Sequence, residues 1–460
     1  MTLRPVPDHL DRAGQWLARQ QKRIRLLQWG MIAVYLVLLL GPALIPLPAR
    51  TDFIWNNAVR FAQFAFWGVW WPFVLLSTAL VGRFWCGILC PEGALSEWAS
   101  ERGAGRAIPA WLKWPGWPTV AFIMTTIYGQ LTSVYQYPAP AVVVLGGSTL
   151  AAIAIGARYG KAKRVWCRFL CPVSGVFGLL AKIAPLHFKV DGPAWHRAQP
   201  RTGTKPPVAV NCAPLVPIKT MRGAGGCHMC GRCSGYRGAI RLAWRSPNEE
   251  IVAVGGETAN GWETFLITAV LMGMATGALQ WSGSALYVTL KAQIAIWCLN
   301  AGVSWPLDAS LPWWMLTNYP GDRMTLVDGA ALLIFIAGAG LLACVTCLPA
   351  LSAGAILLGG WSRRRFHHLA QALIPVAAAG LFCGLLSLTV TQLRMDGVRI
   401  PMIDEVRSLL VGTAGFWSLY LVYSIAGRYG PSRFARLGVS AAISVPIVAA
   451  CGVWALFFLG

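Results

Sequence analysis

Apolar runs of about 20 residues recur along the chain, and short polar segments separate them. A helix of about that length spans the ~30 Å hydrocarbon core of a bilayer. The pattern therefore predicts an all-α integral membrane protein with about nine transmembrane helices. The predicted spans are 27–48, 61–82, 118–136, 140–158, 263–281, 326–348, 369–391, 407–427 and 437–459. We expect the first to be retained, because PLPAR follows it in place of a small-residue cleavage site.

Lysine and arginine are concentrated in every second connection between the predicted spans. Because basic residues collect on cytoplasmic loops, this bias predicts a protein of the bacterial inner membrane with its N-terminus inside and its C-terminus outside. Segments 83–117 and 159–262 are then cytoplasmic. The apolar stretch 286–300 is predicted to be amphipathic or re-entrant, since a further full span would move both C-terminal basic loops outside.

These spans divide the chain into four predicted parts: a cytoplasmic segment 1–26, a four-helix membrane lobe 27–182, a cytoplasmic ferredoxin-like loop 183–262 and a five-helix membrane lobe 263–460. Composition supports a membrane class, because only 12% of residues are charged against about 25% in soluble domains. The net charge of +22 follows from the cytoplasmic loops. No basic stretch shows a nucleic-acid reader motif, so lipid is the expected partner and nucleic acid is not.

One short phrase occurs twice, as FWCGILCP at 84–91 and VWCRFLCP at 165–172. Each copy carries two thiols that a helix would place one turn apart, and a proline that suits the first position of a new helix. A thiol beside a helix N-terminus is easily ionised. We expect one [4Fe–4S] cluster here, since that cluster takes four cysteines; the alternative is four buried apolar thiols. The predicted ligands are Cys86, Cys90, Cys167 and Cys171.

A second cysteine group reads CHMCGRC, which is the C-x2-C-x2-C core of bacterial ferredoxin loops. Its members are Cys227, Cys230 and Cys233. A complete ferredoxin run would place a cysteine at 237, where Arg237 stands instead. Cys212 is the natural fourth ligand of a second [4Fe–4S] cluster. A three-cysteine cluster, a ligand such as His228 and a zinc site are the alternatives.

The remaining cysteines give weaker signals. Cys344 and Cys347, in CVTCLPALSAGAILL at the expected end of the sixth span, resemble a degraded repeat of the phrase. A redox pair, a ligand pair and simple packing are all open for them. Three isolated cysteines in apolar context are expected to serve packing only. These are Cys298, Cys383 and Cys451.

Several other residues have two interpretations each. Asp328, at the outer end of the sixth span, is either a functional intramembrane carboxylate or a helix-start residue. The loop arginines either offset cluster charge and dock an acidic partner, or are solvated loop charges; they are Arg232, Arg237 and Arg241. The outer-loop tryptophans belong either to an interfacial belt or to a partner or quinone surface; they are Trp305, Trp313 and Trp314.

At these motifs the sequence resembles the membrane polyferredoxins of the NapH and NosR kind, accessory proteins of nitrate and nitrous-oxide reduction. The likeness rests on WCGILCP, WCRFLCP, the surrounding spans and the ferredoxin-like loop, and it covers roughly residues 25–250. The resemblance implies cytoplasmic [4Fe–4S] clusters and electron transfer between a membrane donor and an outer-face partner. The chain departs from the family in its single incomplete loop motif and its additional five-span lobe. Similar long polyferredoxins accompany ferrous-iron uptake permeases.

We therefore expect a membrane-bound iron–sulfur electron-transfer protein with two [4Fe–4S] clusters. We expect it to be a component of an electron-transfer system and not a stand-alone enzyme. It would pass electrons between a cytoplasmic or quinone donor or acceptor and a partner, either a redox protein or an iron permease. The alternatives are a permease subunit with structural or sensing clusters and a metal-handling assembly factor.

Overall fold

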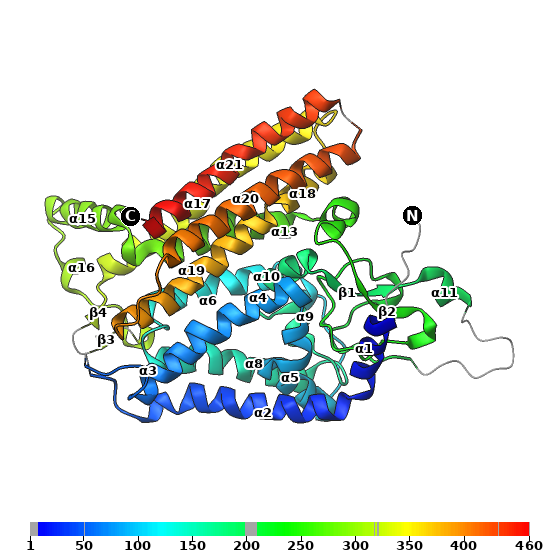
Figure 1. Cartoon of the computed structure of the whole chain (residues 1–460). Helices are drawn as coiled ribbons and strands as arrows, with labels where there is room; N and C mark the ends of the chain where they lie inside the picture. The colour runs from blue at the N-terminus through cyan, green and yellow to red at the C-terminus, as the bar shows by residue number, and fades with distance from the viewer. Residues whose placement is uncertain are drawn as a thin grey trace. The chain divides into compact units, whose positions relative to one another are not determined.

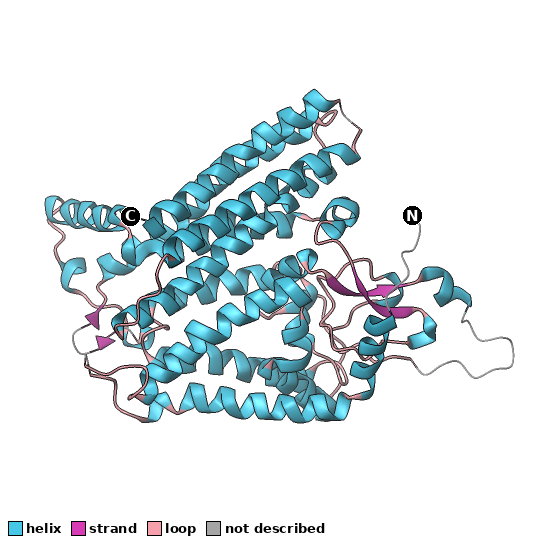
Figure 2. Cartoon of the chain, viewed as in Figure 1, coloured by secondary structure: helices cyan, strands magenta, loops and turns pink. Residues whose placement is uncertain are grey.

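The computed structural model describes residues 8–49, 51–197, 209–316, 318–319, 322–430 and 432–459. Helices make up most of these residues and strands are few (Figures 1 and 2). The expected all-α membrane class is confirmed, because many of the helices are long and apolar. The expected segment 1–26 lies partly outside the described residues.

Within the described residues, eight helices are long and apolar enough to cross a membrane. They are Gln21–Leu44, Ala58–Val81, Pro138–Arg158, Gly261–Gly283, Leu326–Leu357, Arg363–Met395, Ile403–Arg428 and Arg433–Leu459. The expected count of nine is not confirmed, because the predicted span 118–136 forms α6 (Trp117–Leu131) of only 15 residues, about 22 Å of helix. The chain leaves this helix in a turn that places Ser133 at a φ of 51°.

The stretch 286–300 forms α15 (Ala285–Asn300), a helix of 16 residues. Its Lys291 pairs with Asp328, which lies in the first turn of α17 (Leu326–Leu357). The Asp328 carboxylate also accepts the backbone N–H of Thr325 at 2.9 Å, while the Thr325 hydroxyl accepts the N–H of Asp328 at 3.3 Å. This is a capping box, so Asp328 does act as a helix-start residue.

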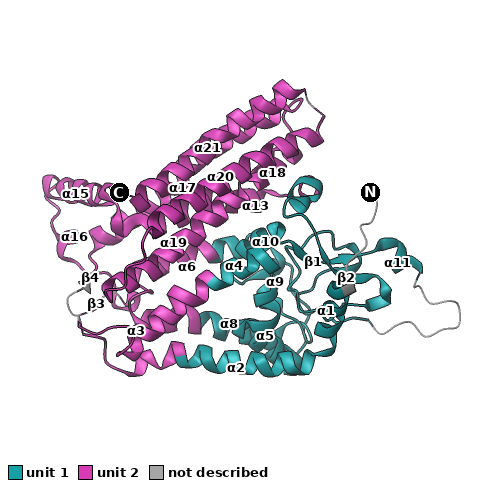
Figure 3. Ribbon diagram, in the orientation of Figure 1, with its two compact units in different colours: residues 1–37, 73–121, 147–254 teal, residues 38–72, 122–146, 255–460 magenta. Residues whose placement is uncertain are grey.

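The chain divides into two compact units, each built from separate stretches of sequence (Figure 3). Unit 1 comprises residues 1–37, 73–121 and 147–254, and unit 2 comprises 38–72, 122–146 and 255–460. The two units therefore interleave along the chain, and the four consecutive parts expected from the sequence stay a prediction.

Unit 1 contains both copies of the repeated phrase and the ferredoxin-like loop. Its helices are α1 (Asp8–Arg19), α5 (Pro91–Arg102), α8 (Gly147–Arg158), α9 (Val165–Phe169), α10 (Ser174–Leu180) and α11 (Gly192–Arg197), with most of α2 (Gln21–Leu40) and α4 (Trp71–Val81). Strands β1 (Leu186–Val190) and β2 (Ile240–Trp244) pair antiparallel, with Leu186 opposite Trp244. This pair brings the two ends of the loop together.

The loop in unit 1 has its own small core. Phe188 of β1 and Ile240 and Leu242 of β2 are buried with Met229 from the cysteine motif. Cys227 and Cys233 pack against this cluster. Since buried apolar side chains supply most of the favourable free energy of folding, this core fixes the backbone of the cysteine motif to the sheet.

Helices α5 and α8 of unit 1 pack at unusually short range. A Cβ added to Gly156 of α8 would lie 2.3 Å from the carbonyl oxygen of Ser96 in α5. One added to Gly103, at the end of α5, would lie 2.1 Å from the carbonyl oxygen of Ala157. Small residues allow such close approach of helices, and here they set the distance between α5 and α8.

Unit 2 is a helical bundle around α17, α19 (Ile374–Met395), α20 (Ile403–Arg428) and α21 (Arg433–Leu459). Its other elements are α3 (Ala58–Gln63), α7 (Pro138–Ala141), α12 (Gly255–Thr258), α13 (Gly261–Phe265), α14 (Thr276–Gln280), α15, α16 (Trp305–Asp308), α18 (Arg363–Ala370), β3 (Asn318–Tyr319) and β4 (Asp322–Arg323). The π-helical segment Leu266–Ala275 joins α13 to α14. It packs on α17 so closely that a Cβ on Gly273 would lie 2.6 Å from the Cα of Gly340.

The close α5–α8 contact gives a direct test of the packing. Gly156→Ala places a methyl group against backbone and should destabilise the protein by about 1–3 kcal/mol. Gly147→Ala lies in the same helix, meets nothing within 4 Å and should be neutral or slightly stabilising. Thermal unfolding of the purified protein in detergent measures both. Equal melting temperatures for the two variants would contradict the packing described here.

Candidate metal centre

The two copies of the repeated phrase share one backbone hydrogen bond, although Trp85–Leu89 is a π-helical turn and α9 is an α-helix. The N–H of Cys90 donates to the carbonyl of Trp85, and the N–H of Cys171 donates to that of Trp166, each at 2.9 Å. Both bonds span five residues, which is wider than the four-residue bond of the α-helix expected for these thiols. Each of these wider turns ends on the second cysteine of its copy.

The prolines behave differently in the two copies. Pro91 is the first residue of α5, and Cys90 is its N-cap, whose Sγ accepts the N–H of Gly93 at 3.4 Å. The helix-start role is therefore confirmed for Pro91. For Pro172 that prediction is wrong by two residues, because α10 begins at Ser174. The N–H of Ser174 donates to the carbonyl of Cys171 at 3.0 Å.

The four thiols of the two copies gather in one place. Burial raises the pKa of Cys90, and the charges of Cys167 and Cys86 raise it further. Burial also raises the pKa of Cys171, helped by Glu92 and by the other three thiols. The pKa of Cys167 rises to about 12 through burial, against the opposing effect of Arg164. Cys90, Cys167 and Cys171 thus each feel the charge of partner thiols, as ligands of one shared centre would.

The loop cysteines form a second group of four. Burial raises the pKa of Cys227 to about 12, and the charges of Cys230 and Cys212 add to the shift. Burial also raises the pKa of Cys233, with contributions from the same three thiols. Backbone N–H groups already point at two of the sulfurs: Met229 donates to Cys227 at 3.4 Å, and Val216 donates to Cys212. The structure therefore brings Cys212 to the C-x2-C-x2-C motif.

Both groups of thiols lie close together within unit 1. Gly87, between Cys86 and Cys90, packs directly on the loop, and a Cβ added to it would lie 1.9 Å from the carbonyl oxygen of His228. The same Cβ would lie 3.0 Å from the backbone nitrogen of Cys230. Arg168 occupies the equivalent position in the second copy. The first copy thus has no side chain at this position, so the loop backbone can contact it. The second copy has a positive charge there.

Buried polar atoms beside the thiols lack partners. Among the described residues, Nδ1 of His228 and Nε of Arg83 have no hydrogen-bond partner. Burial lowers the pKa of His228 well below its usual value, and the charges of Arg83 and Arg164 lower it further. A buried donor without an acceptor is costly. Cluster sulfides and ionised thiolates are acceptors of the required kind, so these residues fit an iron–sulfur cluster.

The spacing of the thiols also bears on the kind of metal. In the part of the chain that the structure describes, no three His, Cys, Asp or Glu side chains converge closely enough to hold a single metal ion. The thiols of each group do act on one another electrostatically. The zinc site considered from the sequence stays an alternative for the loop.

The third cysteine pair differs from the repeated phrase. Cys344 and Cys347 lie inside α17, which continues past Pro349 to Leu357. The pair is therefore not at a helix end, as the sequence suggested, and no new helix starts at its proline. Its redox or ligand role stays a prediction. The Sγ atoms of Cys383 and Cys451 lie near backbone carbonyls at 3.9 and 3.6 Å, and Cys298 is buried.

Two of the loop arginines have defined partners. Arg232 donates to Glu97 at 2.5 Å and to Gln21 at 3.0 Å, so it is an ion-paired residue. Arg237 lies over the rings of Trp195 and Tyr236, with its Cζ 5.1 and 5.6 Å from their centroids. Glu97 was not predicted from the sequence. The sequence marks it only by its position one helical turn after Gly93 in α5, the helix that follows the first copy.

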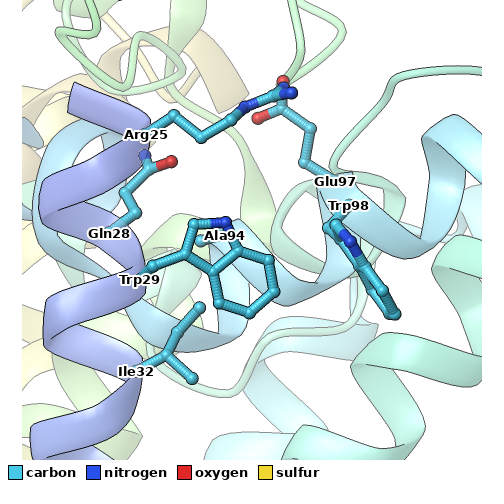
Figure 4. A pocket seen from close by; sticks show the side chains of 7 residues that line it. All are labelled: Arg25, Gln28, Trp29, Ile32, Ala94, Glu97 and Trp98. Carbon is cyan, nitrogen blue, oxygen red and sulfur yellow. The ribbon is translucent and has the colours of Figure 1, made fainter. Parts of the chain in front are cut away.

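A small cavity lies beside Glu97, between α2 and α5 (Figure 4). Its volume is about 20 Å³, which suffices for roughly one water molecule. Trp29 and Trp98 meet edge to face at its wall, with centroids 6.0 Å apart. It has no room for an organic substrate. The lining residues are Arg25, Gln28, Trp29, Ile32, Ala94, Glu97 and Trp98.

Comparison with known proteins supports iron–sulfur chemistry at the repeated phrase. The sequence model of one protein family, described as a 4Fe-4S binding domain, matches the chain twice, at residues 63–109 and 145–191. Each match contains one copy of the repeated phrase. The two matches indicate an iron–sulfur protein with two [4Fe–4S] clusters. No curated protein and no solved structure matches the chain.

The contact between Gly87 and the loop predicts a specific defect. Gly87→Ala should push the His228–Cys230 backbone away and lower the iron content, by up to half of the eight irons that two four-iron clusters hold. Gly30→Ala on α2, where a Cβ meets nothing within 4 Å, is the matched control. Iron and acid-labile sulfide per chain, measured after anaerobic purification, decide the outcome. Full iron content in Gly87→Ala would contradict the close contact.

Proposed function

We propose that this protein is a membrane-bound electron carrier of the polyferredoxin type. Cys86, Cys90, Cys167 and Cys171 would hold one [4Fe–4S] cluster, and Cys212 would complete a second with the three loop cysteines. A cluster of this kind takes up and returns one electron at a time. The observation that carries the proposal is the meeting of two four-cysteine groups across the Gly87 contact.

The environment of the thiols supports electron transfer over catalysis. Cys86 and Cys167 are buried, and the other six thiols are partly covered, so a small molecule has little access to them. The cavity beside Glu97 admits only a water-sized guest. Backbone N–H groups donate to the sulfurs of Cys90 and Cys227, and such hydrogen bonds tune cluster potentials. These features suit a site that exchanges electrons without binding a substrate.

We further propose that the cysteine groups lie on the cytoplasmic side of a bacterial inner membrane. The basic residues of the loop support this orientation through the positive-inside rule. The donor or acceptor on that side would be a soluble carrier or a quinone, and the partner would be a redox protein or an iron permease. The long apolar helices of unit 2 would embed the carrier beside such a partner.

Cysteine substitution tests the ligand sets. The wild-type chain should bind eight iron and eight sulfide, from two clusters of four, and give an EPR signal on reduction. Cys86→Ser and Cys227→Ser should each lose about half of the iron, because each removes one ligand of a different cluster. Cys451→Ser, distant in sequence from both groups, is the control. An iron-free or zinc-bound wild-type protein would refute the function.

Sidedness has a separate test. In proteoliposomes of one orientation, a membrane-impermeant reductant should reduce the clusters only when it is added on the side of the loop. The visible absorbance of the clusters reports the reaction. Equal reduction from either side in sealed vesicles would exclude the proposed one-sided placement while leaving the cluster assignment intact.

A further inference from the structure

The repeated phrase extends to an arginine three residues before its first cysteine. Arg83 precedes Cys86, and Arg164 precedes Cys167, so the repeat reads R-x2-C-x3-C-P. Both side chains are buried, with 4% and 1% exposure. The equivalent backbone bonds also agree: the N–H of Gly87 meets the carbonyl of Arg83 at 3.2 Å, and that of Arg168 meets Arg164 at 3.1 Å.

Arg164 of the second copy reaches into the first copy. Its Nη1 donates to the carbonyl of Cys86, and its Nη2 donates to that of Gly87 at 3.4 Å. Its Nε donates to Glu97 at 2.8 Å. Burial lowers the pKa of Arg164, but the charges of Glu97, Cys167 and Cys230 outweigh that effect. Arg164 therefore feels a thiol from each of the two groups.

Arg83 makes the converse connection, from the first copy to the second. Its Nη2 donates to the hydroxyl of Ser174 at 3.0 Å, and that hydroxyl donates to the carbonyl of Cys167 at 2.8 Å. Its Nη1 donates to the carbonyl of Gly225 in the loop at 3.0 Å. Each arginine thus reaches the backbone of the first cysteine in the opposite copy.

One pair of equivalent positions explains why the two routes differ. Gly93 in the first copy corresponds to Ser174 in the second, 81 residues later. A Cβ on Gly93 would lie 3.2 Å from Nη1 of Arg164, so the missing side chain lets Arg164 reach Cys86 directly. Ser174 instead relays the contact from Arg83. Both routes end on a carbonyl of a ligand cysteine.

The charge balance of the two arginines also differs. Glu97 neutralises Arg164 and is shared with Arg232 of the loop. Arg83 has no acidic partner among the described residues, although its charge acts on Cys167 and Cys227. A buried cation without a counter-charge is costly. Ionised thiolates of both groups are the negative charges within its reach.

We propose that Arg83 and Arg164 form a reciprocal pair of positioning residues that ties the two cysteine groups together and raises the reduction potentials of both clusters. This inference rests on the proposed function. A fixed positive charge favours the more negative, reduced form of a nearby cluster, since net charge and hydrogen bonding set such potentials. Because the pair spans both copies and the loop, its effect extends to both clusters.

Redox titration of the full-length protein, followed by EPR, tests the pair. Arg83→Gln and Arg164→Gln should each lower both potentials, by at least a tenfold change in the reduction equilibrium, or about 59 mV for one electron. Arg164→Lys keeps the positive charge, so its reduction potentials should lie close to those of the wild type. Arg102→Gln removes a surface charge at the end of α5 and should change neither potential.

Milder variants cover the case in which the glutamine variants fail to fold. Ser174→Ala removes the relay from Arg83 to Cys167. Gly93→Ala brings a methyl group to 3.2 Å from Nη1 of Arg164, and also to 3.4 Å from the Cys86 carbonyl oxygen and 3.6 Å from Sγ of Cys167, so Ser174→Ala is the more selective of the two. Each should retain iron and shift both potentials downward. Unchanged potentials in iron-loaded Ser174→Ala and Gly93→Ala would overturn the inference. A wild-type protein without clusters would instead overturn the proposed function, so the two failures are distinguishable.

Discussion

A buried ion pair between Arg164 and Glu97 connects the segments of unit 1 that carry the cysteines. Arg164 precedes the second copy of the phrase, Glu97 lies in the helix after the first, and Arg232 from the loop adds a second bond to the same carboxylate. Removing one partner of such a pair leaves an unpaired buried charge at a cost of about 3–5 kcal/mol. Three stretches distant in sequence therefore meet at this carboxylate, and their arrangement depends on it.

The two copies of the phrase have diverged around shared backbone hydrogen bonds. Gly87 is bare and lets the loop approach, whereas Arg168 at the equivalent position carries charge toward Gly226. Gly93 leaves space for the side chain of Arg164, whereas the hydroxyl of Ser174 links Arg83 to the carbonyl of Cys167. Because of these unlike residues the two copies are not symmetric, and a single ferredoxin-like loop packs against them. The asymmetry explains how two similar motifs coexist with one additional set of cysteines.

Sequence periodicity predicted the fold class well, because a long uncharged run has few alternatives to a membrane helix. It overestimated the length of α6, because the sequence stays uncharged past the turn at Ser133. The grouping of Cys212 with the loop motif was predicted because it is the one other cysteine of that loop, and it stays a prediction. The adjacency of the two groups did not follow, because it depends on Gly87 meeting the backbone of His228. No pattern of residue types marks such a contact, and Glu97 was overlooked for the same reason.

The start of the chain is tied to a segment made much later. Gln21 donates to the carbonyl of Cys230 at 3.0 Å, across 209 residues of sequence, and Leu17 of α1 closes on Gly231. During synthesis the first helix therefore emerges long before its docking surface exists. At a typical 5–20 residues per second, the delay lasts on the order of ten seconds or more. The contacts of Leu17 and Gln21 with the cysteine motif therefore form only after the loop has been made.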